Sequence, residues 1–220
     1  MAKTTKATWK YTLREIIIVI IGITIAFSMN KCAENVKDSK LKTQYLTNLK
    51  RDVEADKIQL KKNIEAIDKK LVICSEIIPV LNSEKNQDMR LMNNIFAIVK
   101  YENFSPKNIT YNTLINSGDL KLIEDFELKT AIQQHYANYD EVSDDYVRHT
   151  SLIKDYLGNY LVNHADYDQI PQGKGPFLDE IKLKNIVRAL LTTFDDKKKA
   201  TAFGIESCDV LIAKIDAALD

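Results

Sequence analysis

The first feature of the chain is an uninterrupted apolar run from Ile16 to Met29. The run holds fourteen residues without a charge, and seven of them are isoleucine. A membrane span needs about 20 residues, and counting from Trp9 extends the run to about 21 residues, or roughly 31 Å of helix. Trp9 suits the headgroup layer. The pattern predicts a transmembrane anchor with its core at 16–29 and a span of about 9–29, after a basic N-terminal tail at 1–15.

Two other interpretations compete with the anchor. A signal peptide has a basic start, a short apolar core and small residues before its cleavage site, and Ala26-Phe27-Ser28 could form such a site. Against cleavage, Glu15 stands at the opening of the core and no break follows it. An isoleucine-rich run could also form a buried strand, but the rest of the chain offers no strand partner. The anchor fits best.

Small residues recur at helical spacing inside the anchor. Gly22 and Ala26 lie four residues apart, and Thr24 and Ser28 repeat the spacing on the next face. Pairs of this kind let two helix backbones approach closely in lipid. We therefore expect the lipid bilayer as one partner, and self-association or a membrane protein as another.

After the anchor the pattern changes to that of a long amphipathic helix. A polar junction at 30–38 is expected to precede the helix, and Pro79 to end or kink it. The apolar seam is Leu46, Leu49, Val53, Leu60, Ile64, Ile67, Leu71, Cys74, Ile78 and Leu81, with one polar position near Asp56. Heptad spacing fits packing against the protein's own helices or a parallel coiled-coil stalk. The junction and this helix form the second region, 30–83.

The remaining region, 84–220, reads as helices joined by polar turns. A turn at 82–88 precedes a short helix with Met89, Met92, Ile95, Phe96 and Val99 on one face. Thr110 is expected to cap a brief helix that closes at Gly118, and Asp125 to cap a helix reaching about Asn163. The seam of that helix is Leu128, Ile132, His135, Tyr139, Val142, Tyr146, His149, Ile153, Tyr156 and Tyr160.

The C-terminal part is a loop followed by more helix. The loop, 164–176, holds two prolines and two glycines. A helical region at 177–219 follows, with a break expected near 192–196 and the seam Ile205, Cys208, Ile212, Ile215 and Leu219. The predicted fold class is all-α: a transmembrane helix, a long amphipathic helix and an antiparallel helical bundle.

Charge and cysteine content argue against nucleic-acid binding, a disulfide framework and a zinc site. The chain has 31 Lys+Arg and 31 Asp+Glu, whereas a nucleic-acid-binding protein should show a basic excess on one face. Cys32, Cys74 and Cys208 are odd in number and contain no CxxC pair, so neither a disulfide framework nor a zinc site is indicated. Cys74 and Cys208 occupy apolar-seam positions, where a buried thiol is expected.

Basic residues flank the anchor on both sides. Four precede it and four follow within about fifteen residues, so the positive-inside rule does not decide its orientation. A short basic tail, one span and a large domain is the usual layout of a signal anchor. We expect a single-pass protein of the bacterial inner membrane with its N-terminus in the cytoplasm and its domain outside.

Three segments carry a family resemblance. They are Glu15 with the following IIIVIIGITIA, YLTNLKRD at 45–52 and TYNTLINSGDLKLI at 110–123, together with Asn30 and Glu34. On these residues the chain resembles an uncharacterised family of bacterial single-pass, all-helical membrane proteins with a short N-terminal span. The resemblance implies a membrane location and a helical bundle, and it brings no activity or site.

The seam histidines are the best candidates for chemistry. His135 and His149 share a helix face, but fourteen residues of helix separate them by about 21 Å, too far to share one metal ion. Asp145 precedes His149 by one turn, where a carboxylate–imidazole pair could form. No Glu-x-x-His motif of a di-iron site occurs. We expect each imidazole to be hydrogen-bonded to a neighbouring tyrosine or aspartate in the core.

Other charged groups are expected to be structural. Arg14 and Glu15 form an ionisable pair at the membrane edge, which could be functional but is better explained as a neutralised pair that fixes depth. The run Lys197–Lys199 reads as a solvated helix face. No Gly-rich phosphate loop, G-x-S-x-G or Cys–His signature occurs.

The sequence therefore predicts no catalytic, cofactor-binding or metal-binding residues, and a protein that is not an enzyme. The favoured function is a membrane-anchored structural or interaction protein that self-associates or tethers a partner and does not bind nucleic acid. The alternative is an extracytoplasmic sensor whose helical core binds a small molecule and acts with a membrane partner.

Overall fold

The structure is a computed structural model that describes residues 5–82 and 89–220. Two compact units make up the chain, Met1–Leu46 and Thr47–Asp220. The described residues are helical apart from loops and one isolated antiparallel bridge between Ala165 and Phe177. The predicted all-helical class is therefore confirmed for this part of the chain. Residues 1–4 of the predicted tail and 83–88 of the predicted turn lie outside the described residues.

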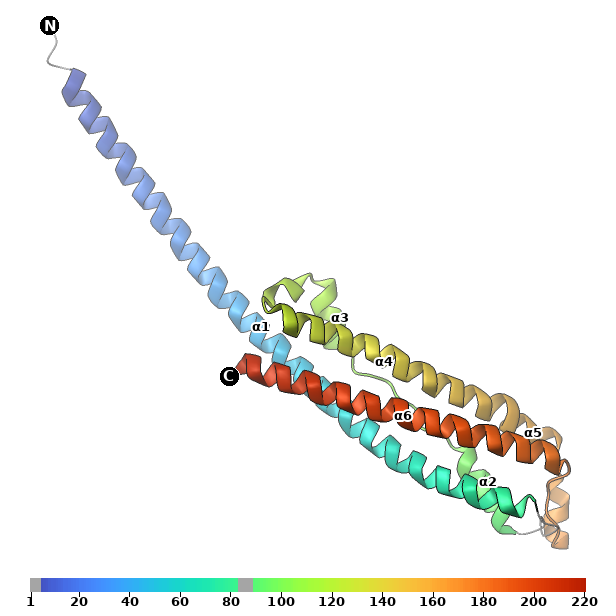
Figure 1. The fold of residues 1–220 in the computed structure, drawn as a ribbon. Coiled ribbons are helices and arrows are strands. Elements are labelled where there is room, and N and C mark those ends of the chain that lie inside the picture. The colour runs from blue at the N-terminus through green and yellow to red at the C-terminus, as the bar shows by residue number, and fades with distance from the viewer. Residues whose placement is uncertain (1–4, 83–88) are drawn as a thin grey trace. The chain divides into compact units, whose positions relative to one another are not determined.

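The first unit is the N-terminal part of helix α1, which runs from Thr5 to Val80 (Figure 1). Its isoleucines are exposed in the structure, as at Ile18, where 59% of the side chain is accessible. Within the described residues α1 is the one helix long and apolar enough, by length and composition, to cross a membrane. Gly22 has no atom within 4 Å of where a Cβ would stand.

The polar junction does not interrupt α1, so the prediction of a separate helix start after it was wrong. The helix continues through 30–38 without a break. This segment contains neither proline nor glycine, and four of its nine residues, Lys31, Ala33, Glu34 and Lys37, are of types that favour helix in water. Polarity there marks the end of the apolar run and not the end of the helix.

In the second unit α1 contributes a regular buried seam. Successive buried positions alternate in steps of three and four residues: Leu49, Val53, Asp56, Leu60, Asn63, Ile67, Lys70, Cys74, Ile77 and Leu81. The heptad spacing was predicted, but one of its two rows was misplaced by a residue. Asn63, Lys70 and Ile77 are buried, whereas the predicted seam placed Ile64, Leu71 and Ile78 in this row. Helix α1 ends one residue after Pro79, as predicted.

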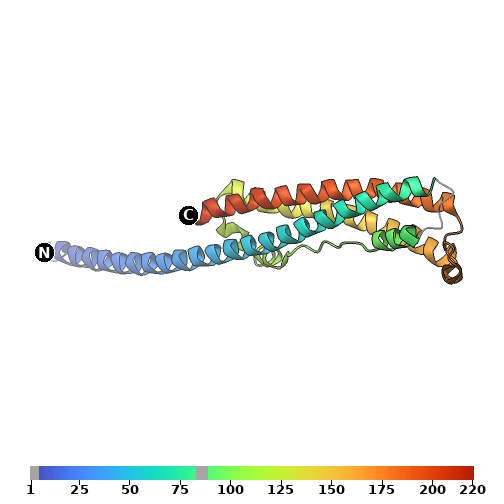
Figure 2. The same ribbon diagram turned by 90° about the horizontal axis from the view of Figure 1, so that it is seen from below.

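Helices α2 (Met89–Val99) and α3 (Ile109–Asn116) are joined by an extended segment, residues 100–108, here called the strap. Figure 2 shows the strap as the thin trace between them. The buried face of α2 is Leu91, Ile95 and Ile98, whereas Met89 and Phe96 of the predicted face are exposed.

The ends of α3 differ in how well the sequence predicted them. Asn108, not Thr110, is the N-cap, and the Thr110 hydroxyl instead donates a hydrogen bond to the Asp52 carboxylate. At the other end Gly118 has φ 74° directly after the C-cap Ser117, which confirms it as the C′ residue. The 3₁₀ helix η1 (Asp119–Leu122) follows.

The next helical run is α4 (Phe126–Leu152), a π-helical segment η2 (Ile153–Gly158) and α5 (Asn159–Asn163). Asp125 caps α4 as predicted, accepting hydrogen bonds from the N–H groups of Glu127 at 2.8 Å and Leu128 at 3.2 Å. The predicted seam is buried except for Tyr156, which is 60% exposed, while Leu157 is fully buried. A π turn holds more residues per turn than an α turn, so it advances the seam by one position.

The loop at 164–176 contains a 3₁₀ helix, η3 (Tyr167–Gln172), which the sequence did not predict. Helix α6 (Glu180–Leu219) then runs without the break expected near 192–196. Phe194 is fully buried in that stretch, and so is Leu190 just before it. Near the C-terminus Cys208, Leu211 and Ile215 are buried, so Leu211 replaces the predicted Ile212 at the centre of the seam.

Within the second unit the long helices lie side by side in both views (Figures 1 and 2). Ion pairs of α1 with α6 join Lys50 to Asp216 and Asp68 to Lys198, each at 2.6 Å, so these helices are antiparallel. Helices α4 and α6 are antiparallel by the same reasoning, since Tyr139 contacts Cys208 and His149 contacts Thr193. At Gly204 a Cβ would stand 3.1 Å from Leu60 and 3.3 Å from Val142, so glycine allows three helices to meet.

Candidate functional site

Both seam histidines are buried between α4 and α6, and both have hydroxyl partners. His135 Nδ1 lies 2.8 Å from Ser207 Oγ, and His149 Nδ1 lies 2.9 Å from Thr193 Oγ1. The prediction of tyrosine or aspartate partners was therefore wrong. Burial lowers the pKa of His135 to about 4. Burial, helped by the nearby Lys197 and Lys70 ammonium groups, lowers the pKa of His149 to about 3.

The carboxylate–imidazole pair does not form. Asp145 forms an ion pair with Arg148, one turn away on the exposed side of α4. Nor do the residues that the structure describes contain a group of three or more His, Cys, Asp or Glu side chains placed to hold a metal ion.

The strap is held by the polar residues of the α1 seam. The Asp56 carboxylate accepts the Lys107 backbone N–H at 2.9 Å and 3.1 Å. Asn63 donates to the Asn103 carbonyl and to the Tyr146 hydroxyl, each at 3.0 Å. Lys70 donates to the Lys100 carbonyl. An extended segment has no helical partners for its backbone groups, so these side chains supply them.

Lys197 lies inside the protein, so the prediction of a solvated lysine face at 197–199 was wrong for this residue, whereas the side chains of Lys198 and Lys199 are 41% and 71% exposed as predicted. The Lys197 side chain is fully buried, and its ammonium donates to the Glu102 carbonyl at 2.9 Å and lies 4.2 Å from the centre of the Tyr146 ring. The Glu102 carboxylate accepts from Lys70 and lies 3.7 Å from Lys197. Burial lowers the pKa of Lys197 to about 8. This network ties the strap to α1 and α6.

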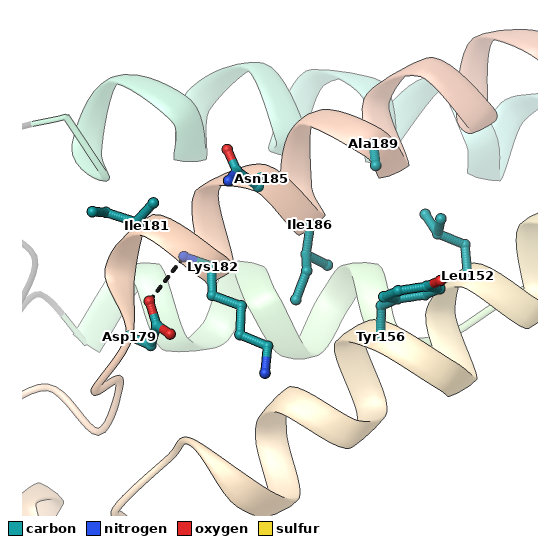
Figure 3. Close-up of a pocket in the computed structure, with 8 residues that line it drawn as sticks. All are labelled: Leu152, Tyr156, Asp179, Ile181, Lys182, Asn185, Ile186 and Ala189. Carbon is teal, nitrogen blue, oxygen red and sulfur yellow. Dashed lines mark hydrogen bonds between the residues drawn. The ribbon is translucent and has the colours of Figure 1, made fainter.

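A cleft of about 630 Å³ lies between α6 and the end of α4 with its π-helical continuation (Figure 3). Its apolar lining comes from Leu152, Tyr156, Ile181, Ile186 and Ala189. Tyr156 stands here because the π turn moves it out of the buried seam. Figure 3 shows Leu152 and Tyr156 facing Ile186 across the cleft.

The polar groups of the cleft gather at the start of α6. The Asp179 carboxylate caps this helix by accepting the Lys182 backbone N–H at 3.0 Å. The Lys182 ammonium lies 2.7 Å from His164 Nε2, and the His164 ring stacks on Tyr160 with centroids 5.6 Å apart. One end of an apolar cleft thus carries a lysine whose neighbouring carboxylate is engaged with backbone.

Comparison with protein families gives one match. Residues 15–170 match a family of unknown function, DUF6090. The chain belongs to the DUF6090 family. Neither the curated proteins nor the solved structures gave a match. The expectation of an uncharacterised family is thereby confirmed. In this DUF6090 protein the matched range includes the apolar run, the strap and α4, and it ends before α6.

The features of this DUF6090 protein that the sequence reasoning missed are the strap network and the cleft. The polar α1 residues carried a signal, because Asp56, Asn63 and Lys70 repeat every seven residues among buried positions. No sequence signal marked the cleft, since it depends on a π turn that displaces Tyr156 from the buried seam. Cys74 and Cys208 are buried, as expected, and Cys32 is exposed.

Proposed function

We propose that this protein is a membrane-anchored helical structural or interaction protein and not an enzyme. Its N-terminal helix spans the bacterial inner membrane once, and its second unit is an antiparallel bundle that tethers a partner or a second copy of the chain. The N-terminus lies in the cytoplasm and the bundle outside.

One observation carries the proposal. The apolar run of α1 is exposed throughout, although residues 47–220 form a core of their own. Exposed apolar residues of this number are unfavourable in water and favourable in lipid, where each isoleucine contributes about −0.5 kcal/mol. Helix is also the one regular structure that a single segment can adopt in lipid, because its backbone groups are satisfied internally.

A sensor is the second candidate, and the cleft favours it. A volume of about 630 Å³ falls within the range typical of small-molecule sites, roughly 300–1,000 Å³. Ligand binding to the folded state would raise the melting temperature.

Purification of the full-length protein in mild detergent tests the two candidates together. A tethering protein should co-purify with a stoichiometric partner or as a defined oligomer. A monomer without a partner, whose melting temperature rises with a small molecule, would instead support the sensor.

Self-association is expected to depend on the face of the anchor that carries Gly22 and Ala26. Replacing both Gly22 and Ala26 by isoleucine should reduce oligomer size in detergent, because isoleucine keeps the two helix backbones apart. Insertion should be unaffected, since isoleucine is more apolar. The check is the size on a calibrated column, and an unchanged size would remove this face as an interface.

The orientation can be tested with Cys32. Cys74 and Cys208 are buried, whereas Cys32 is exposed three residues after the apolar run. A membrane-impermeant maleimide added to intact spheroplasts should label the wild type and not Cys32→Ser. Labelling of the wild type only after lysis would place the bundle in the cytoplasm.

A further inference from the structure

We propose that the cleft between α6 and the end of α4 binds a long-chain fatty acid or another acyl amphiphile with one anionic end. This inference goes beyond the tethering role, and it does not depend on whether α1 crosses a membrane. It rests on the shape of the cleft, its apolar walls and the position of one ammonium group.

The walls favour an apolar ligand body. Tyr156 and Leu152 form one side, and Ile186 and Ala189 form the other (Figure 3). Tyr156 and Ile181 are 60% and 70% exposed, so the structure leaves these large apolar side chains in contact with water. Covering them would gain about 25 cal/mol for each Å² of apolar surface removed from water.

The cleft follows α6 for about two helical turns, which accommodates the part of an acyl chain next to its anionic end. Lys182 and Ala189 mark the cleft along α6 and lie seven residues apart, about 10 Å or two turns of helix. Along this path Asn185 is the polar side chain between them, so an extended acyl group meets mostly carbon. The volume of about 630 Å³ suits a ligand of this size.

The polar end favours an anion. An ammonium has three donors, and the Lys182 group lies within hydrogen-bond distance of one acceptor, His164 Nε2, at 2.7 Å. The Asp179 carboxylate turns instead to the backbone at the start of α6, where it accepts the Lys182 N–H. The ammonium therefore keeps donors for a carboxylate or phosphate, while His164 is itself held by stacking on Tyr160.

The test uses the full-length protein in phosphatidylcholine nanodiscs and a palmitic acid analogue that carries a photoreactive diazirine in its chain. Cross-links mapped by mass spectrometry should fall on peptides containing 152–156 and 181–189. Lys182→Gln should raise the half-saturating probe concentration about tenfold, since a hydrogen bond to a charged group contributes about 1.5 kcal/mol or more. Lys182→Arg should restore binding, and Ala189→Trp should abolish it by filling the cleft.

Lys184→Gln is the matched control, because Lys184 lies on the same helix but does not line the cleft. It should leave the half-saturating concentration unchanged, and circular dichroism should show that all variants fold. Competition then identifies the source of the ligand. Displacement by palmitate alone indicates a free fatty acid, and displacement also by phosphatidylglycerol indicates a lipid; either result supports an acyl anion.

Three results would overturn the proposal. They are labelling that Ala189→Trp does not reduce, competition by a neutral fatty alcohol equal to that by palmitate, and equal effects of Lys182→Gln and Lys184→Gln. If a photoreactive residue at position 156 cross-links a second protein while the fatty acid probe gives no cleft adduct, the cleft is a protein-docking surface and the proposal is wrong.

Discussion

Replacing Glu102 by glutamine should lower the free energy of unfolding by about 3 kcal/mol, because it leaves buried ammonium groups without their carboxylate. Glu102 accepts from Lys70 and lies 3.7 Å from Lys197, and the two lysine side chains are 9% and 0% exposed. Chemical denaturation of the full-length protein in mild detergent, followed by circular dichroism, measures the change.

An exposed ion pair between the same two helices provides the control. Asp68 pairs with Lys198 at 2.6 Å, and both side chains are more than 40% exposed. Asp68→Asn should therefore change stability by less than about 1 kcal/mol. Adding Lys197→Met to Glu102→Gln should recover part of the loss, because it removes one of the stranded charges. Equal effects of the two single substitutions would show that the strap network contributes no more than a surface pair.

Acid should destabilise the protein through its two buried histidines. The pKa of His149 is about 3 in the folded protein, below its ordinary value of 6.5, so the unfolded chain binds the proton more readily. The stability that the neutral imidazole contributes is complete above pH 6.5 and is lost as the pH falls toward 3. Two pH units below 6.5 this loss reaches about 2.7 kcal/mol.

His149→Gln should consequently reverse its effect with pH. At pH 7 the variant should be about 1 kcal/mol less stable than the wild type, since its hydrogen bond to Thr193 is altered. At pH 4.5 it should be the more stable protein, because it has no imidazole to protonate. Denaturation curves at both pH values check this, and a variant that stays less stable at pH 4.5 would contradict the low pKa.

Asp56→Asn is expected to act in the opposite direction. Burial raises the pKa of Asp56 to about 6, above the ordinary 3.8, so its contribution to stability grows as the pH falls from 6 toward 3.8. Asparagine cannot take up this proton. The stability of the variant, relative to wild type, should therefore decrease on acidification, whereas that of His149→Gln should increase.

The features that the sequence predicted correctly depend on local chemistry. The apolar run, the Asp125 cap and the glycine after α3 each follow from a short stretch of residues. The break predicted at 30–38 does not occur, because polar residues such as Glu34 and Lys37 have high helix propensity and continue the helix. The polar composition of 30–38 indicates that this segment lies in water, but it does not indicate where the helix ends.

The buried polar network and the cleft could not be predicted from short stretches of sequence, because both depend on contacts between distant parts of the chain. Asp56, Asn63 and Lys70 are buried because the strap brings backbone groups to them, and the strap is distant in sequence. Lys197 is buried for the same reason. The exposure of Tyr156 depends on a π turn, which shifts the seam by one residue and has no reliable sequence signal. The burial or exposure of each of these residues therefore depends on tertiary contacts and not on the neighbouring sequence.

Alkaline extraction of membranes that contain the full-length chain tests the central claim, membrane anchoring by α1, most directly. The intact protein should stay in the pellet at its full mass, whereas a variant with Ile18, Ile21 and Ile25 replaced by lysine should be released, because charges at the bilayer centre oppose insertion. Release of the wild type, or a mature chain lacking the residues before Met29, would contradict the account.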